Sequence, residues 1–328
     1  MSYSMSTKLS RSSYTVVLVG ATGGLGKEVA NVFLSSYKPF FSRIIVTVRD
    51  TTTPAAKELA EQGAELVTIS TVGAVASLTK AFEGVDAVVN LLGRAPDEFR
   101  DAVGEAAVKS GAKVYFPSEF GSDHRINDFP GWDDADWIFK GQHARKYRQL
   151  GAGRTKVISV YNGLFLEGLL GPWFGFDTAK FTYTSVGSPD AKTAVTAKAD
   201  VGRALAELTL LSLNPETAVS VPNDVHIAGS NVSWRHIRDI VQKVRNELSV
   251  EPRGEIKVES VELAVYRENL KKEQLVEPRA GPLDHIKVLI GEGKMDFSKN
   301  NDELVNPGQS IWKWKTVEKF VREKGGQV

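Results

Sequence analysis

Three regularly spaced glycines, Gly20, Gly23 and Gly26, directly follow an apolar run at positions 14–19. This order predicts a buried strand, a tight turn and a helix, which together bring backbone N–H groups and a positive helix end up to a pyrophosphate. A dinucleotide site is therefore expected at the turn residues Gly20, Thr22, Gly23, Leu25 and Gly26. The simpler alternative is a junction that only needs a positive φ, because the spacing differs from the familiar G-x-G-x-x-G.

The charges that follow the second predicted strand favour NADP(H) over NAD(H). An NAD-specific site has an acidic residue at this strand end, whereas this chain has Arg49 first and then Asp50. A guanidinium fork suits a 2′-phosphate, and Lys57 would add a second cation. Two alternatives to an NADP(H) site remain. In one, Asp50 serves an NAD site, and in the other, Arg49 is only a solvated charge at a strand end.

Two later strand ends carry residues that would reach the same ligand. The fourth predicted strand ends in Leu92 and Gly93, where a ligand of an open α/β sheet lies. The fifth runs into Ser118 and Glu119, at the edge that a nicotinamide ring would occupy. The alternative for Gly93 is a glycine that merely ends the strand, and the alternative for Ser118 is a Pro-Ser turn.

The candidates for proton transfer are few. Lys140 lies in a predicted helix, but Asp136 stands four residues before it, so the Tyr-x-x-x-Lys pair of common short-chain dehydrogenases is missing. From the residues alone, Lys140 is more simply a solvated charge. His143 shares its helical face and either borders the same cleft or is partly buried. The five histidines lack metal-ligand spacing and there is no cysteine, so we expect no metal, disulfide or thiol chemistry.

The elements that would position these residues alternate between strand and helix. Strands are predicted at 14–19, 43–48, 64–69, 87–92 and 113–116, with helices between them. A polar and aromatic loop at 121–137, a helix at 139–150 and a sixth strand at 156–160 follow. The pattern predicts an α/β fold, a Rossmann-type doubly wound parallel sheet with a smaller α/β substrate-binding domain.

The chain divides into three expected parts. Residues 1–13 would form a flexible tail, 14–160 the dinucleotide-binding domain, and 161–328 mostly the substrate-binding domain, with a return to the first domain around 192–230. Later helices are expected at 201–213, 234–248, 261–274 and 312–324. Trp312 and Trp314, at the start of the last one, are expected to serve packing or an interface edge.

Composition excludes several classes of protein. The 328 residues carry a net charge of +1, which favours neither a nucleic-acid partner nor a membrane surface. No apolar run approaches the roughly 18–20 residues of a membrane span. With no cysteine and no secretory signal in the first residues, we expect a cytoplasmic enzyme, either a monomer or a homodimer.

Several of these segments resemble the NmrA-like family, in particular its isoflavone reductase and phenylcoumaran benzylic ether reductase group of atypical short-chain dehydrogenases. The similarity covers the glycine turn, Arg49 and, most specifically, Tyr115–Gly121 (YFPSEFG). Lys140 falls where this family carries its catalytic lysine. The resemblance implies further cofactor contacts at Phe120 and Asn162. It also implies a substrate pocket with Asp123, His124, His143, Phe165 and Leu169.

The resemblance implies an NADPH-dependent reductase that delivers hydride to a small, aromatic, phenylpropanoid-like substrate, with Lys140 as general acid/base. Two departures limit the comparison. Ile69-Ser70-Thr71 stands where the family often has Gly-Asp near the adenine, and the loop at 123–137 differs on the substrate side. The alternatives are a non-catalytic, NADP(H)-sensing regulator and a quinone or aldehyde reductase on the same scaffold.

Overall fold

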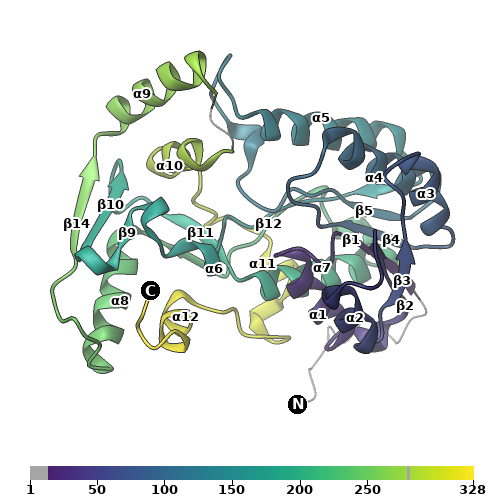
Figure 1. Cartoon of the computed structure of the whole chain (residues 1–328), viewed down its shortest axis with the longest axis horizontal. Helices are drawn as coiled ribbons and strands as arrows, with labels where there is room; N and C mark the ends of the chain where they lie inside the picture. The colour runs from purple at the N-terminus through teal and green to yellow at the C-terminus, as the bar shows by residue number, and fades with distance from the viewer. Residues whose placement is uncertain (1–13, 279–280) are drawn as a thin grey trace.

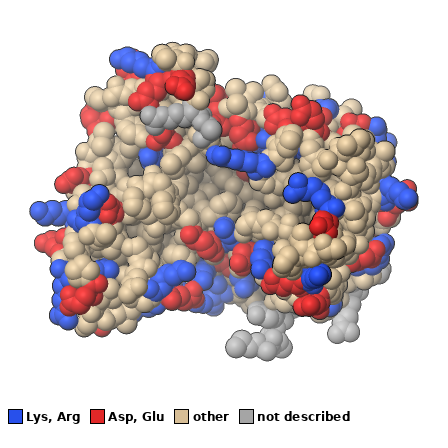
Figure 2. All heavy atoms as spheres, viewed as in Figure 1, with Lys and Arg blue, Asp and Glu red and all other residues tan. Residues whose placement is uncertain are grey.

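The computed structural model describes residues 14–278 and 281–328, so the expected tail at 1–13 lies outside the described residues. Figure 1 shows a larger lobe built on a parallel sheet and a smaller lobe of short strands and helices beside it. The face seen in Figure 2 is hollowed between the two lobes, with acidic and basic side chains mixed around the hollow.

The central sheet of the larger lobe has six parallel strands in the order β3-β2-β1-β4-β5-β6. The order reverses between β1 and β4, and ligands of such sheets bind outside the carboxyl ends of the strands at this reversal. The strands are β1 (Tyr14–Val19), β2 (Phe41–Val48), β3 (Glu65–Thr68), β4 (Ala87–Asn90), β5 (Val114–Phe116) and β6 (Lys156–Val157). The expected Rossmann-type α/β sheet is therefore confirmed.

Helices cover both faces of this sheet (Figure 1). In β1, Val16 and Leu18 pack with one set of helices, and Val17 and Val19 pack with the other. Because successive side chains point to opposite faces, a strand covered on both sides must be apolar throughout. The first set is α1 (Gly26–Leu34), α2 (Pro54–Glu61) and α7 (Lys198–Leu213). The second is α3 (Ala74–Ala81), α4 (Asp97–Lys109) and α5 (Ala135–Leu150).

The single strand predicted at 156–160 is divided in the structure. After β6, the chain continues as β7 (Ser159–Tyr161), which pairs in parallel with β12 (Asp224–His226) rather than with β5. Between these segments α7 returns to the larger lobe and packs closely on α1. A Cβ on Gly202 would lie 3.1 Å from the Cα of Val29, so a glycine permits this approach.

The smaller lobe contains two three-stranded sheets. One is formed by β8 (Leu164–Phe165), β11 (Thr193–Thr196) and β13 (Ser230–Val232), and the other by β9 (Phe176–Asp177), β10 (Thr182–Val186) and β14 (Lys257–Val261). Its helices include α8 (Trp234–Glu247), α9 (Leu263–Val276), α10 (Leu283–Gly291), α12 (Val317–Glu323) and the single turn α6 (Leu166–Leu169). Another single turn, α11 (Asp302–Val305), packs on the core of the larger lobe.

The prediction of a last helix from Trp312 is wrong at its start, because α12 begins at Val317. Trp312 and Trp314 lie before it, and both are buried in the core of the larger lobe. Their rings meet edge to face with centroids 5.0 Å apart. These tryptophans therefore serve packing, one of the two roles expected for them.

A buried carboxyl group between α1 and α7 predicts a pH-dependent stability. Glu207 is 1% exposed and accepts a 2.7 Å hydrogen bond from the Tyr37 hydroxyl. Burial raises the pKa of Glu207 to about 7, against an ordinary value of 4.5. The folded state thus holds its proton longer than the unfolded state. Stability is therefore highest below the ordinary pKa and declines as pH rises towards the folded value, by on the order of 3 kcal/mol.

We expect Glu207→Gln to remove most of this decline, because the amide cannot ionise and still accepts the tyrosine bond. Urea unfolding of both proteins between pH 5 and pH 8 gives their free energies of unfolding. We expect these two values to diverge as pH rises. A difference in the free energy of unfolding that is the same at every pH would contradict the raised pKa of Glu207.

Candidate active site

The glycine turn after β1 is closed tightly on itself. Gly20 has a φ of +82°, and a Cβ there would lie 3.0 Å from the backbone of Leu91 and Leu92 in the neighbouring strand end. The Gly23 N–H donates to the Gly20 carbonyl oxygen over 3.0 Å. A Cβ on Gly26 would lie only 2.1 Å from that same oxygen. The turn therefore requires glycine at both its first and its last position.

We expect Gly26→Ala to weaken NADPH binding by more than about tenfold, because the added methyl group must push the turn backbone apart. Fluorescence titration with NADPH measures the dissociation constant, and circular dichroism monitors folding. Gly24→Ala is the matched control, since a Cβ at this position of the same turn would meet only the Lys198 ammonium, at 3.9 Å. Equal affinities in the two variants would contradict the steric argument.

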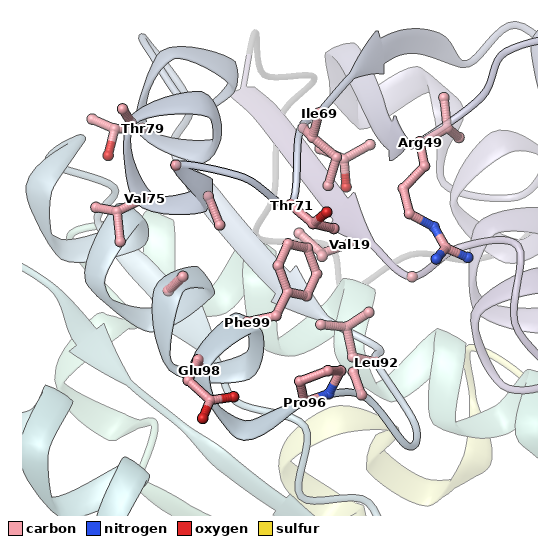
Figure 3. Close-up of a pocket in the computed structure, with 18 of the residues that line it drawn as sticks. Val19, Arg49, Ile69, Thr71, Val75, Thr79, Leu92, Pro96, Glu98 and Phe99 are labelled. Carbon is pink, nitrogen blue, oxygen red and sulfur yellow. The ribbon is translucent and has the colours of Figure 1, made fainter.

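A cavity of about 1540 Å³ extends along the carboxyl ends of β1, β2, β3 and β4 (Figure 3). This is the edge at which a doubly wound sheet binds its ligand. Of the cofactor residues expected from the sequence, Gly20, Thr22, Arg49 and Leu92 line it. Other expected residues do not line this cavity: Gly23, Leu25 and Gly26 at the turn, Gly93 after β4, and Lys57 within α2.

Many residues that line this cavity were not expected as contacts, among them Ile69, Thr71 and Phe99. Figure 3 shows the Phe99 ring of α4 pointing into it near Thr71, with Arg49 reaching in from the end of β2 and Ile69 above. Ile69 and Thr71 directly follow β3, so their place at a strand end was a signal available in the sequence. No signal in the sequence pointed to Phe99, because its position depends on how α4 crosses the sheet.

Asp50, the residue that keeps NAD as an alternative, also lines the cavity. Its Oδ1 accepts 2.7 Å hydrogen bonds from both the hydroxyl and the N–H of Thr52. These bonds lower the pKa of Asp50 from its ordinary value. One oxygen of this carboxylate is thus already engaged by its own loop.

A second, much smaller cavity lies at the end of β5, where the sequence placed Ser118 and Glu119. Ser118 Oγ donates to the Leu92 carbonyl oxygen over 2.6 Å and so ties the ends of β5 and β4 together. Lys140 Nζ, on α5, donates to the Glu119 carbonyl oxygen over 3.2 Å. The structure therefore brings Lys140 beside the Ser118–Glu119 segment, although more than twenty residues separate them in the sequence.

An acidic residue one helical turn away holds the Lys140 ammonium in place. Asp136 Oδ2 lies 3.1 Å from Lys140 Nζ, and its other oxygen lies 2.7 Å from a nitrogen of Arg100. Burial raises the pKa of Asp136, but Lys140 and Arg100 together outweigh it and hold that pKa below its ordinary value. The Asp136 carboxylate therefore stays ionised at neutral pH and forms an ion pair with Lys140.

His143 lies behind Lys140 rather than in an open pocket. It is 5% exposed, and its Nε2 lies 2.7 Å from the Tyr115 hydroxyl. Since Asn90 Nδ2 already donates to that hydroxyl, the tyrosine donates its own hydrogen to His143. Burial lowers the pKa of His143 to about 4, so the imidazole is neutral at physiological pH.

Two other residues expected near the substrate are tied into buried polar pairs. Asp123 is 4% exposed and bonds Arg125 and His226. Burial raises its pKa, but these bonds prevail and hold the pKa of Asp123 well below its usual range. His124 Nε2 lies 2.7 Å from Glu119 Oε2. Neither Asp123 nor His124 lines the two cavities described above.

The remaining expected residues lie in the interior or at its margin. Leu169 is fully buried in the core of the smaller lobe, and Phe165 is partly buried against the core of the larger one. Phe120 is 8% exposed with a φ of +29°. Asn162 is fully buried, and its amide donates to the Gly163 carbonyl oxygen over 3.3 Å. None of the four lines either cavity.

Among the described residues, no three histidine, aspartate or glutamate side chains are grouped closely enough to hold a metal ion. In the same part of the chain, no helix is long and apolar enough to cross a membrane.

Known proteins share both the sequence pattern and the fold. The model of the NmrA-like family matches residues 12–321. An NmrA-like family domain-containing oxidoreductase of Gibberella moniliformis is 27% identical over 239 residues, covering 69% of this chain and 76% of that protein. Phenylcoumaran benzylic ether reductase PT1 of Pinus taeda is 31% identical over 165 residues, about half of each chain (47% and 51%).

Solved structures agree on the fold. An isoflavone reductase superposes with a TM-score of 0.72 at 16% identity, covering 95% of this chain and all of that one. The protein AtPrR2, solved with NADP⁺ and (+)-pinoresinol, gives 0.73 at 17% identity, covering 96% and 99%. The resemblance that rested on Tyr115–Gly121 and the glycine turn is thus confirmed by a match over nearly the whole sequence. The chain belongs to the NmrA-like family.

Proposed function

We propose that this chain is an NADPH-dependent reductase that delivers hydride to a small aromatic substrate, with Lys140 as general acid/base. One observation carries the proposal: the end of β5 joins a dinucleotide-sized cavity on one side to Lys140 on the other. Ser118 bonds Leu92 of the large cavity, and the adjacent Glu119 bonds Lys140. The curated relatives are named an oxidoreductase and a reductase, which supports the same chemistry.

The residues around the large cavity fit a dinucleotide with a 2′-phosphate. The glycine turn excludes side chains where the pyrophosphate of such a ligand approaches the backbone, and Arg49 supplies a guanidinium at the end of β2. Solved neighbours include a leucoanthocyanidin reductase of Vitis vinifera and a quinone oxidoreductase of Escherichia coli, both in complexes with NADPH. We therefore propose NADP(H) as the cofactor.

The chemistry divides between the cofactor and the chain. Bound NADPH supplies the hydride. The Asp136 carboxylate, 3.1 Å away, pairs with the Lys140 ammonium. As hydride reaches an electrophilic carbon, negative charge develops on the neighbouring oxygen, and Lys140 would donate its proton there, directly or through a water. The Glu119 carbonyl oxygen orients the ammonium towards the end of β5.

NADPH oxidation across a panel of aromatic enones, benzylic ethers, quinones and aldehydes tests the proposal. We expect turnover with at least one aromatic class, and the class that reacts fastest separates an ether or enone reductase from a quinone or aldehyde reductase. Tight NADPH binding without turnover on any compound would contradict the reductase and favour an NADP(H)-sensing regulator. The missing Tyr-x-x-x-Lys pair is compatible with that outcome.

A further inference from the structure

The small cavity beside Lys140 has the size and lining of a site for one water molecule. Its volume is about 10 Å³, close to that of a single water-sized probe. Lys140, Ser118 and Glu119 contribute polar groups to its wall, as do residues of the neighbouring elements: Asn90, Arg100 and His143. A buried water needs two to four polar partners, and this wall offers more than that.

One buried oxygen of Glu119 lacks the hydrogen bond that such a water would donate. The side chain is 3% exposed, and its Oε2 lies 2.7 Å from His124 Nε2. Its Oε1 is buried and has no hydrogen-bond partner within residues 14–278 and 281–328. Leaving a buried carboxylate oxygen unpaired is unfavourable, and such groups in native proteins are nearly always bonded to protein or to ordered water.

Lys140, which also lines this cavity, has a further N–H donor for such a water. An ammonium group carries three N–H donors. In the described part of the chain, one meets the Glu119 carbonyl oxygen at 3.2 Å and another the Asp136 carboxylate at 3.1 Å. The third is available to a water in the adjoining cavity.

We propose that a single water in this cavity bridges Lys140 Nζ and Glu119 Oε1, and that Glu119 and His124 form a proton relay which recharges Lys140 after each turnover. His124 is 9% exposed and forms the outer end of this chain of groups. The inference rests on the proposed general acid role of Lys140. Neither Glu119 nor His124 needs to touch the substrate, so both are positioning residues.

The relay conserves protons and moves no electrons. Once the substrate oxygen replaces the Glu119 carbonyl oxygen as the acceptor of one Lys140 N–H, that proton passes to it and Lys140 becomes a neutral amine. His124 takes a proton from solvent and passes it to the Glu119 carboxylate, which hands it through the water to the amine, so that Glu119 is a carboxylate again at the end. One proton from solvent thus replaces the proton that left with the product. The charged groups that face this path are Asp136 and Arg100, and the neutral His143 lies behind it.

Glu119→Gln tests the relay, because the amide keeps the size of the side chain but cannot carry a proton through. We expect kcat to fall by about 10-fold to 100-fold with KM and NADPH affinity nearly unchanged. The solvent deuterium isotope effect on kcat should rise, since reprotonation becomes limiting. Glu119→Gln combined with His124→Gln should be no slower than Glu119→Gln alone, because both act in one path. Glu105→Gln, a surface partner of Lys109, is the matched control.

A merely structural role for Glu119 would give a different pattern. NADPH affinity and the melting temperature would then fall together with kcat, and the isotope effect would not change. This result would overturn the relay, and so would wild-type kcat in Glu119→Gln.

A titration without turnover separates this inference from the proposed function. NMR of ¹³C-dimethylated lysines follows the Lys140 ammonium in the protein without cofactor, with Lys140→Arg assigning the signal. We expect the titration midpoint to move to lower pH in Glu119→Gln, since an anion coupled through the water is lost. An unchanged midpoint would overturn the water bridge even in an active enzyme. Absence of turnover in the wild-type protein, with the shift present, would overturn the reductase and leave the bridge standing.

Discussion

Replacing Lys140 by methionine is expected to lower kcat by about two to four orders of magnitude, the range that a positioned general acid contributes. Methionine keeps most of the aliphatic stem, so the packing of α5 is preserved. The lost ion pair with Asp136 is partly exposed and contributes about 1 kcal/mol or less to stability. NADPH affinity should change little, because Lys140 does not line the large cavity. Steady-state kinetics on the best substrate of the panel measure the effect.

Lys146→Met is the matched control for this variant. Lys146 lies on the same helix, pairs with Asp101 at 2.6 Å and has a side chain that is 47% exposed. We expect it to keep wild-type kcat. If Lys140→Met also kept it, the general acid role would be wrong, and the proton would have to come from solvent or from the substrate itself.

Replacing Arg49 by serine is expected to reduce the preference for NADPH over NADH by about a hundredfold. Hydrogen bonds between charged groups contribute about 1.5–3 kcal/mol each, and about 1.4 kcal/mol corresponds to a factor of ten in affinity. Only NADPH carries the 2′-phosphate, so its dissociation constant should rise while that of NADH stays nearly constant. Fluorescence titrations with the two cofactors give both numbers.

Arg43→Ser controls for the loss of a cation from this part of the chain. Arg43 lies on β2, the strand that ends just before Arg49, but it is paired with Glu65 at 2.6 Å and does not line the cavity. We expect both of its cofactor affinities to match the wild type. Equal weakening of NADPH and NADH binding in Arg49→Ser would contradict a 2′-phosphate contact and indicate one with a part that the cofactors share.

The first half of the fold was predictable because its signals are local. The buried strands are mostly apolar runs, and turn residues separate the helices from the strands that follow them. Gly63 and Gly111, for example, end helices with positive φ values of 98° and 77°. Pro54 stands at the first turn of α2, as expected. The observed bounds of β1 agree with the predicted ones at both ends, and those of the other elements differ by only a few residues.

The smaller lobe was less predictable because its strands are short and pair with distant segments. β8 and β9 have two residues each, too few to show an alternating pattern. β10 pairs with β14, more than seventy residues later. β7 appeared to continue β6, and only its pairing with β12 divides them. Such partners are chosen by the packing of the whole chain, which no local window of sequence contains.

The sequence by itself determined the residues that depend on local backbone and on position along a strand: the glycine turn, Arg49 after β2, and Ser118 after β5. Only the tertiary structure decided what each side chain meets. It set Lys140 against the Glu119 carbonyl oxygen, buried His143 behind it on Tyr115, and turned Phe99 into the large cavity. The physical reason is that a turn's conformation is set by its own residues. Burial and hydrogen-bond partners, by contrast, are set by elements that meet only when the chain has folded.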